Sequence, residues 1–547
     1  MSLLLPRSLR AQWQSSIGAS GTVLGAPVGS DVERYMHAVS VAGLIRPVPW
    51  AARPISARDV ADLLRGESGS SPWTTVMQRA ANRKASVGGS VFAAYNTGFP
   101  WGANDGPVWQ GRGGTAAAGV SASVQLWRVR LTAAPILFSA QNSAYPLVTT
   151  PGYSPLMSAV YPHDIDLPQR FGNSAYTRVN PGESSIDVAL GSMSMGLSTR
   201  AEGWGIGETF PAILGPNAGG FPHLYLGTSA TGARVPFVGR IAARYLLGSL
   251  AQSKWSPVTG PDSFASIEFS GRRRVAVGVV ASIMPDVAPG LELGVSRFFH
   301  SPWREHGRAW GAWSKPFEGI LKDGLKESAP GSPDPKSDFD NQLASLFARW
   351  NFPRRGAEAS FEYFREDHNW DGRDLAGEPE QNGAVAASLR VVTARRPSVL
   401  ALLTFEYFSG DVRPIAQQRA QGLLYFHGAL RQGHTESGQL LGAPIGPGAV
   451  DGQRMSWERF VPAGALRVSL QRWRTRSKTS TNAEGLFLPA AVYDGDAHDW
   501  TVDGSVSLTR VRRAATTMLE AGVASAQVFG FSESRWNFYL RASAARF

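Results

Sequence analysis

The chain lacks cysteine, and it is poor in charge and in long apolar runs. Without cysteine it can form no disulfide, no thiolate metal site and no cysteine nucleophile. Charged residues make up 18% of the sequence, below the roughly 25% of a typical soluble domain. No stretch approaches the roughly 20 consecutive apolar residues of a membrane-spanning helix. These absences exclude a disulfide scaffold, a zinc-thiolate protein and a helical membrane protein.

The 547 residues are rich in glycine and aromatic side chains and carry a net charge of +11. An abundance of aromatic residues argues against a disordered chain. Arginine is scattered along the sequence, and residues 272–274 form the one tight cluster. Scattered guanidinium groups suit phosphates or carboxylates spread over a surface better than they suit nucleic acid. We therefore expect outer-membrane lipid, lipopolysaccharide or an acidic or neutral surface polysaccharide as partners, and no nucleic acid.

Residues 1–29 resemble the tail of a signal peptide. They have no basic region at their start, and their apolar run is too short for the central region of such a peptide. We interpret them as a remnant whose front is missing, either because the start codon is placed too late or because the sequence has been trimmed.

Residues 30–85 have the spacing of a small helical bundle. Ser30 with Glu33 three residues on forms a capping box, and Ser56 with Asp59 has the same spacing. A third helix is predicted over residues 71–84, with proline at its first position. Three helices of this size cannot bury a core alone, so we expect them to pack on something larger.

Residues 86–547 have the sequence pattern of strands joined by turns. Apolar and polar residues alternate with a period of two, which is the signature of a strand with one apolar face. One example is Leu403, Phe405 and Tyr407 alternating with Thr404 and Glu406. No repeat of 40–50 residues divides the chain into propeller blades. The pattern favours a transmembrane barrel, and about 460 residues at roughly 25 for each strand and connection give about 18 strands.

The last strand also fits a barrel. Trp536, Phe538 and Leu540 share one face of an extended segment, and the chain stops on Phe547. Phe547 falls on the opposite face by strict alternation. The sequence therefore predicts either a bulge or a terminal Arg546 at the membrane interface, where a charge costs little.

Four long stretches between the strands are rich in glycine and proline and poor in strand signals. They are residues 141–170, 204–228, 328–339 and 427–451. Loops of this length are usually functional or disordered. The stretch 328–339 has the composition of a mobile surface loop. The other three carry many aromatic residues, so we expect them to be ordered and folded into the barrel.

No catalytic motif stands out. Glu358 and Glu362 would lie about 13 Å apart on one face of a strand, beyond the spacing of glycosidase pairs. With Glu366 they are better interpreted as lumen-facing groups paired with arginine. Asp494 and Asp496 begin an acidic loop that fails the EF-hand pattern, because the twelfth position holds no glutamate. We expect no enzyme activity, no metal and no cofactor.

Four segments resemble, in order, motifs of the capsule assembly protein Wzi family. Residues 204–226 begin Trp-Gly-Ile-Gly and end Phe-Pro-His-Leu-Tyr-Leu. Residues 315–322 read Lys-Pro-Phe-Glu-Gly-Ile-Leu-Lys, and residues 361–368 read Phe-Glu-Tyr-Phe-Arg-Glu-Asp-His. The fourth match covers residues 431–448. Together the matches extend over most of the chain.

The resemblance implies an all-β membrane protein: a transmembrane antiparallel β-barrel of about 18 strands with a short N-terminal α-helical bundle. It implies that residues 30–85 lie in the periplasm, that residues 86–547 form the outer-membrane barrel, and that long loops occlude its lumen. The implied role is non-enzymatic. The protein would assemble or anchor capsular polysaccharide or exopolysaccharide at the cell surface as a lectin-like monomer.

Sugar recognition requires apolar ring faces and groups that bind hydroxyls or carboxylates, and tryptophan, tyrosine and arginine supply both. Aromatic girdles at the membrane interface are the alternative role for any single tryptophan. The candidate ligand residues in or beside the matched segments are Trp204, Tyr225, Trp303, Trp370, Arg373 and His434.

Two other functions fit the same sequence. One is a porin or oligosaccharide channel with an arginine-lined lumen, and the other is a structural outer-membrane scaffold. Conductance would reveal a channel, and glycan binding would exclude a scaffold.

Overall fold

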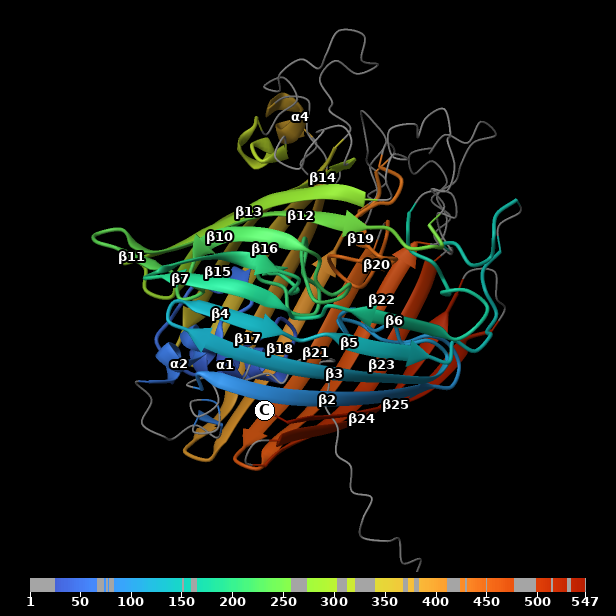
Figure 1. The fold of residues 1–547 in the computed structure, drawn as a ribbon, viewed down its shortest axis with the longest axis horizontal. Coiled ribbons are helices and arrows are strands. Elements are labelled where there is room, and N and C mark those ends of the chain that lie inside the picture. The colour runs from blue at the N-terminus through green and yellow to red at the C-terminus, as the bar shows by residue number, and fades with distance from the viewer. Residues whose placement is uncertain are drawn as a thin grey trace, which may run out of the picture.

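A computed structural model gives the fold of the chain (Figure 1). The residues that it describes are 25–65, 73, 74, 77, 83–149, 152–158, 165–256, 273–302, 312–319, 340–366, 372–377, 383–410, 424–427, 430–448, 450–476, 498–512, 515–528 and 533–546. Everything below concerns these residues.

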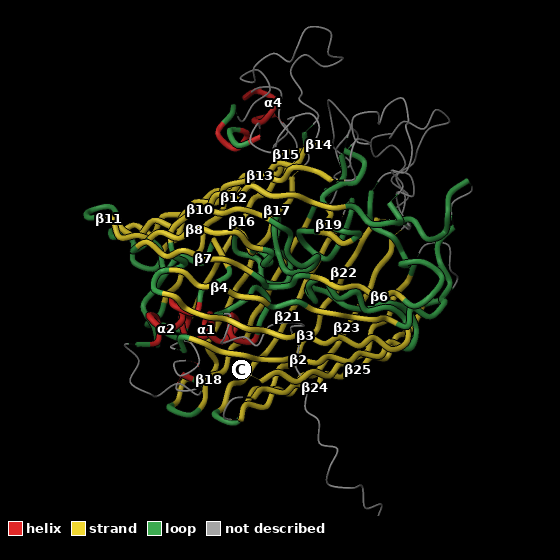
Figure 2. Tube along the Cα trace, in the orientation of Figure 1, coloured by secondary structure: helices red, strands yellow, loops and turns green. Residues whose placement is uncertain are grey.

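All the described strands except β1, β9, β19 and β20 form one closed antiparallel barrel of 18 strands (Figure 2). Three of them are interrupted, so that β4 and β5, β6 and β7, and β10 and β11 each make one wall strand. The predicted fold class and strand number are therefore confirmed. The first wall segments are β2 (Ala85–Asn96), β3 (Gly113–Leu126), β4 (Val129–Ala133), β5 (Ile136–Ala140), β6 (Tyr176–Asn180), β7 (Ser185–Leu190), β8 (Met193–Ser198), β10 (His223–Thr228), β11 (Ala233–Val235) and β12 (Gly239–Ala251).

The wall continues with longer strands. They are β13 (Arg273–Pro285), β14 (Leu291–Pro302), β15 (Asn341–Phe352), β16 (Ala357–Glu366), β17 (Gly383–Arg396), β18 (Val399–Ser409), β21 (Val450–Val461), β22 (Gly464–Arg476), β23 (His498–Arg512), β24 (Ala515–Gln527) and β25 (Arg535–Arg546). Small elements outside the wall are β1 (Ala52–Arg53), β9 (Gly203–Trp204), β19 (Thr435–Glu436), β20 (Gln439–Leu440), the short helix α4 (Gly372–Gly377) and the 3₁₀ turn η3 (Lys315–Phe317).

The two ends of the barrel differ. At one end neighbouring strands are joined by turns such as residues 127–128, 191–192 and 397–398, and we call this the short-turn end. At the other end the connections are long, as with residues 97–112 between β2 and β3. One predicted loop is corrected here: the end of the stretch 204–228 forms wall strand β10. The predicted loop 328–339 lies outside the described residues.

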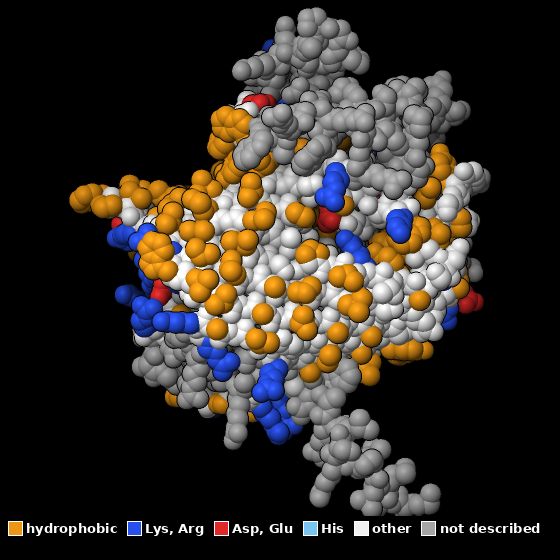
Figure 3. Space-filling view, viewed as in Figure 1, with side chains coloured by type: hydrophobic (Ala, Val, Ile, Leu, Met, Phe, Trp, Pro, Cys, Tyr) orange, Lys and Arg blue, Asp and Glu red, His pale blue; other side chains and the backbone are white. Residues whose placement is uncertain are grey.

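The outer face of the wall is apolar (Figure 3). Phe361, Phe405 and Leu470 are each about half exposed, whereas Glu406 on the same strand as Phe405 is buried on the lumen side. This alternation places apolar side chains toward lipid, as expected for a transmembrane barrel. In the part of the chain that the structure describes, no helix is long and apolar enough to cross a membrane.

β25 closes the barrel by pairing with β24 and β2. Trp536, Phe538 and Leu540 point outward, as the alternation predicts. The register of β25 is unbroken up to Arg546, so no bulge intervenes and Arg546 stands at the strand end. Phe547 lies outside the described residues.

A charge on this outer face should be costly in the middle of a strand. Leu540, half exposed near the centre of β25, faces the hydrocarbon layer. We expect Leu540→Arg to destabilise the barrel by about 2–4 kcal/mol, and Leu126→Arg, at the end of β3, by about 0–1 kcal/mol. Urea titration of the barrel refolded in lipid vesicles measures both values. Equal losses at the two positions would contradict a lipid-facing centre.

Two N-terminal helices sit at the short-turn end, α1 (Asp31–Val41) and α2 (Ala57–Leu64). The side chains of Ser30 and Ser56 cap them by accepting from the backbone N–H of Glu33 and Asp59, so both predicted starts are confirmed. Most of the third predicted helix, residues 71–84, lies outside the described residues.

The helices pack on the inner face of the wall. Tyr35 of α1 stacks on Trp73 at 5.1 Å and meets Phe460 of β21 edge-on at 5.3 Å. The apolar cluster around them also contains Leu400 and Leu402 of β18. As the sequence suggests, the short helices bury their apolar faces on a larger body, and that body is the barrel.

Candidate functional site

Three connections from the long-loop end fold into the lumen and meet there. We call them together the plug: residues 97–112, 199–222, 424–427 and 430–448. The backbone N–H of Gly106 donates to Pro216 O at 2.8 Å, and that of Gly215 donates to Leu441 O at 2.9 Å. The plug is therefore one hydrogen-bonded body built from distant parts of the sequence, and the predicted inward folding of two of the long loops is confirmed.

The plug is packed against the wall by a large apolar cluster. Trp204, Phe210 and Phe221 of the plug are at most 2% exposed. They pack with inward side chains of β12 to β18, including Phe298 and Phe408. Dense apolar packing of this kind leaves little room for water between these side chains.

Carboxylates on the wall accept hydrogen bonds from the backbone of the plug. Glu362 accepts from the N–H of Ile206 at 3.2 Å. Glu406 accepts from the N–H of Glu208 at 3.0 Å and of Thr209 at 3.1 Å. A buried carboxylate that accepts backbone N–H groups satisfies donors that would otherwise be orphaned. These contacts fix the height of the plug in the barrel.

A second set of buried charges holds the helical end. Glu358 is 1% exposed and receives His37 Nε2 of α1 at 2.8 Å. It also pairs with Arg349 at 2.7 Å and with Arg390 at 3.2 Å. Arg349 pairs in addition with Glu292 at 2.9 Å. The predicted lumen-facing pairing of Glu358 with arginine is thus confirmed, and its role is to attach α1 to the wall.

The structure brings together two of the predicted ligand residues. Trp204 and His434 are fully buried in the plug. Both rings pack on Phe298, with ring centroids 6.1 Å and 5.5 Å away. His434 Nε2 donates to Ile213 O at 2.7 Å. In this arrangement both side chains stabilise the plug, and neither reaches the outer surface.

The other four predicted residues lie apart. Tyr225 is on β10 and faces a cavity at the short-turn end. Arg373 is exposed on α4, in the connection between β16 and β17 at the long-loop end. Trp303 and Trp370 lie outside the described residues. The role of the set in ligand binding stays a prediction, and Tyr225 and Arg373 are the two described members that an external ligand could meet.

His434 makes the plug sensitive to acid. Burial, with Arg274 nearby, lowers the pKa of His434 to about 3, against an unfolded value of about 6.5. The unfolded chain therefore takes up the proton first, and stability falls as the pH drops from about 6.5 toward about 3. When the pH is lowered from about 7 to about 5, we expect protonation of this side chain in the unfolded state to reduce the free energy of unfolding by about 2 kcal/mol.

Urea midpoints of the refolded protein at the two pH values measure this loss. His434→Gln can still donate to Ile213 O and carries no titrating group, so it should remove this part of the pH dependence. An unchanged dependence in the variant would show that other groups cause it.

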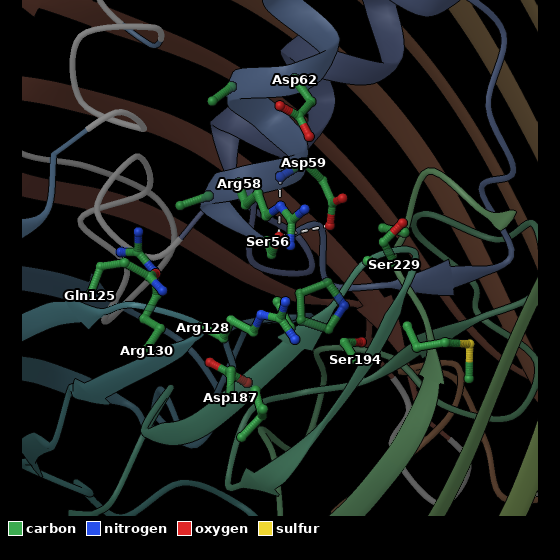
Figure 4. Close-up of a pocket in the computed structure, with 18 of the residues that line it drawn as sticks. Ser56, Arg58, Asp59, Asp62, Gln125, Arg128, Arg130, Asp187, Ser194 and Ser229 are labelled. Atoms are coloured by element: carbon green, nitrogen blue, oxygen red, sulfur yellow. Dashed lines mark hydrogen bonds between the residues drawn. The ribbon is translucent and has the colours of Figure 1, made fainter.

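A cavity of about 580 Å³ opens at the short-turn end between α2 and the wall (Figure 4). Its size is within the roughly 300–1,000 Å³ of small-ligand sites. Among the described residues, eight cationic side chains line it against three carboxylates, a net charge of +5. The cations are Arg58, Arg65, Arg83, Lys84, Arg128, Arg130, Arg200 and Arg244, and the carboxylates are Asp59, Asp62 and Asp187.

The floor of the cavity is a rigid network. Arg244 lies over the ring of Tyr225 at 3.9 Å and pairs with Glu202 at 2.7 Å. Asp187 pairs with Arg200 at 2.9 Å and receives the hydroxyl of Tyr225 at 2.5 Å. The Nε atoms of Arg200 and Arg244 are buried and have no hydrogen-bond acceptor among the described residues. These two arginines are therefore incompletely satisfied by the described residues.

The three carboxylates of the lining do not neutralise its cationic side chains. Asp62 pairs with Arg65 at 2.6 Å, and Asp59 accepts a hydrogen bond from the hydroxyl of Ser56 at 2.7 Å. With respect to the residues that the structure describes, Arg58 and Arg128 have no ion-pair partner, and Arg130 bonds only to the neutral Gln125 and Ser123. Figure 4 shows Arg58 and Arg128 extending into the space from opposite sides. Sequence reasoning missed this site because its cations come from separate segments.

Within the described ranges, no three His, Cys, Asp or Glu side chains are placed to hold a metal ion. Asp494 and Asp496, which begin the acidic loop, lie outside those ranges. The arrangement at the cavity, with more cations than carboxylates in its described lining, is suited to binding an anion.

No family model matches the sequence, and no curated protein sequence matches it. Among solved structures, the chain is similar to Wzi of Escherichia coli, described as a carbohydrate-binding β-barrel of the outer membrane involved in group 1 capsule assembly. The TM-score is 0.60 at 12% identity, covering 97% of this chain and 99% of that one. The resemblance to the Wzi family is thereby confirmed at the level of the fold.

Two proteins of Pseudomonas aeruginosa are more distant. OccK7 (OpdD) has a TM-score of 0.41 at 8% identity, covering 85% of this chain and 99% of that one. OccD3 (OpdP) has a TM-score of 0.38 at 8% identity, covering 84% and 91%. These weaker likenesses support no functional inference. The closed barrel and its apolar outer face fit the outer membrane.

Proposed function

We propose that the protein is a non-enzymatic, lectin-like barrel of the outer membrane that assembles or anchors capsular polysaccharide or exopolysaccharide at the cell surface. The observation that carries the proposal is the end-to-end correspondence with Wzi, over 97% of this chain. A packed plug in the lumen is compatible with an anchor, whereas a channel requires an open path.

The proposal includes an orientation. Bacterial barrels place their short turns in the periplasm and their longer loops outside the cell. The helices of residues 30–85 would then be periplasmic, and the long-loop end of the barrel formed by residues 86–547 would face the surrounding polysaccharide. Outer-membrane lipid and lipopolysaccharide would contact the apolar outer face, and a single copy would suffice, because one chain closes the barrel.

Two measurements on the same preparation test the proposal. The refolded protein, shown to be a barrel by its heat-modifiable migration in gels, is applied to an array of bacterial surface glycans and is also inserted in a planar bilayer. We expect glycan binding and no conductance steps. Steady open steps would favour the porin alternative, and absence of both signals would favour a structural scaffold.

Retention of polysaccharide by cells completes the test. Deleting the gene should release polysaccharide into the medium, and the intact gene should restore it to the surface. Arg373→Ala, on exposed α4, reports whether that predicted ligand residue contributes, because an exposed substitution of this kind leaves the barrel intact.

A further inference from the structure

We propose that the basic cavity at the short-turn end binds the carboxylate-bearing sugar units of an acidic polysaccharide, so that the polymer is engaged on the side opposite the long loops. This inference rests on the proposed function and deepens it, because it names the charge of the glycan and a place where the glycan binds.

The first support is the excess of positive charge around the cavity. Arg58 and Arg128 are exposed, face one space and form no ion pair with a described carboxylate. An excess of positive over negative charge around one space becomes favourable when an anion enters. Arginine is suited to this role, because its planar fork binds a carboxylate through two parallel hydrogen bonds.

The second support lies on the floor. Arg200 and Arg244 are 6% and 8% exposed, and each keeps a buried Nε without an acceptor among the described residues. Their other nitrogens are held by Asp187 and Glu202. A buried donor without an acceptor costs free energy. The floor therefore holds two arginines that the described acceptors satisfy incompletely.

The third support distinguishes a sugar from a lipid headgroup. The floor is made by side chains on the lumen side of the wall, such as Tyr225 and Arg244, and α2 forms the roof. Lipid headgroups surround the outer face of a barrel and do not line its interior. The lining also offers the neutral groups Ser56, Ser194 and Gln125, which suit sugar hydroxyls.

Calorimetric titration of the full-length refolded protein tests the site. The probe is an oligogalacturonate, and a malto-oligosaccharide of equal length is the neutral comparison. We expect the acidic probe to bind and its affinity to fall at high salt. Arg58→Gln combined with Arg128→Gln should weaken binding about tenfold or more, because charge-assisted hydrogen bonds are lost.

The matched control is Arg354→Gln combined with Arg355→Gln. These two side chains are exposed on the turn between β15 and β16, at the same end of the barrel but outside the cavity. The control removes the same charge and should change affinity by less than about twofold. Equal weakening by both pairs would overturn the proposal in favour of general charge attraction.

The remaining outcomes separate this inference from the proposed function. Binding of the acidic probe that neither pair weakens, or binding of neutral glycans alone, overturns the cavity assignment and leaves glycan anchoring standing. Stronger binding of inorganic phosphate or of anionic lipid vesicles than of the acidic probe overturns it in favour of a phosphate ligand. Failure to bind any glycan, here and on the array, overturns both.

Discussion

Replacing Arg349 by alanine is expected to destabilise the protein by about 3–5 kcal/mol, because it breaks a buried ion-pair network. Arg349 is 2% exposed and pairs with Glu292 and Glu358 at 2.9 Å and 2.7 Å. Its third contact, Nη2 to Val48 O at 2.7 Å, attaches the segment between α1 and α2 to the wall. The loss would leave two buried carboxylates short of a partner and would release the helical end.

Urea unfolding measures the stability loss, and limited proteolysis between α1 and α2 measures the release. Arg354→Ala, an exposed arginine on the nearby turn, is the control and should change neither. Arg349→Met combined with Glu358→Gln should be more stable than Arg349→Ala. The double variant removes the charge of Glu358 together with that of its partner Arg349, whereas Arg349→Ala leaves Glu358 charged and buried. A single variant as stable as the parent would show that the network contributes little.

Much of the fold was predictable because the signal is local. Phe405 and Glu406 are adjacent, and a strand must place them on opposite faces. One faces lipid and the other faces the plug, as the alternation indicates. The caps at Ser30 and Ser56 are equally local, because a cap and the N–H it satisfies are three residues apart. Membership of β10 in the wall was missed because glycine and proline precede it.

The candidate site was predictable only in part. Glu358 and Glu362 alternate alike along β16, yet one pairs with arginine and the other accepts the N–H of Ile206. The difference depends on where a loop 156 residues away in sequence folds. Trp204 was expected to meet a ligand and is buried for the same reason. A motif identifies the loop, but its inward path is set by long-range packing.

Replacing Glu406 by alanine should loosen the plug and give the barrel a conductance that the parent lacks. Glu406 is 4% exposed and accepts from two backbone N–H groups, those of Glu208 and Thr209, as well as from the Thr209 hydroxyl. Each buried N–H left without an acceptor costs about 1–3 kcal/mol. The penalty falls on the plugged state, since water can satisfy these groups once the segment withdraws.

Adding Glu362→Ala should enlarge the effect. A side chain on Gly205 would lie 2.5 Å from the Glu362 carboxylate, so the backbone of the plug sits directly on this group. Single-channel recording in planar bilayers should show rare, brief openings for the single variant and longer ones for the double variant. Ser469→Ala is the control, because this buried hydroxyl pairs with Ser505 within the wall at 2.8 Å. If the double variant forms a heat-modifiable barrel and stays closed, apolar packing of Phe210 and its neighbours holds the plug without the carboxylates.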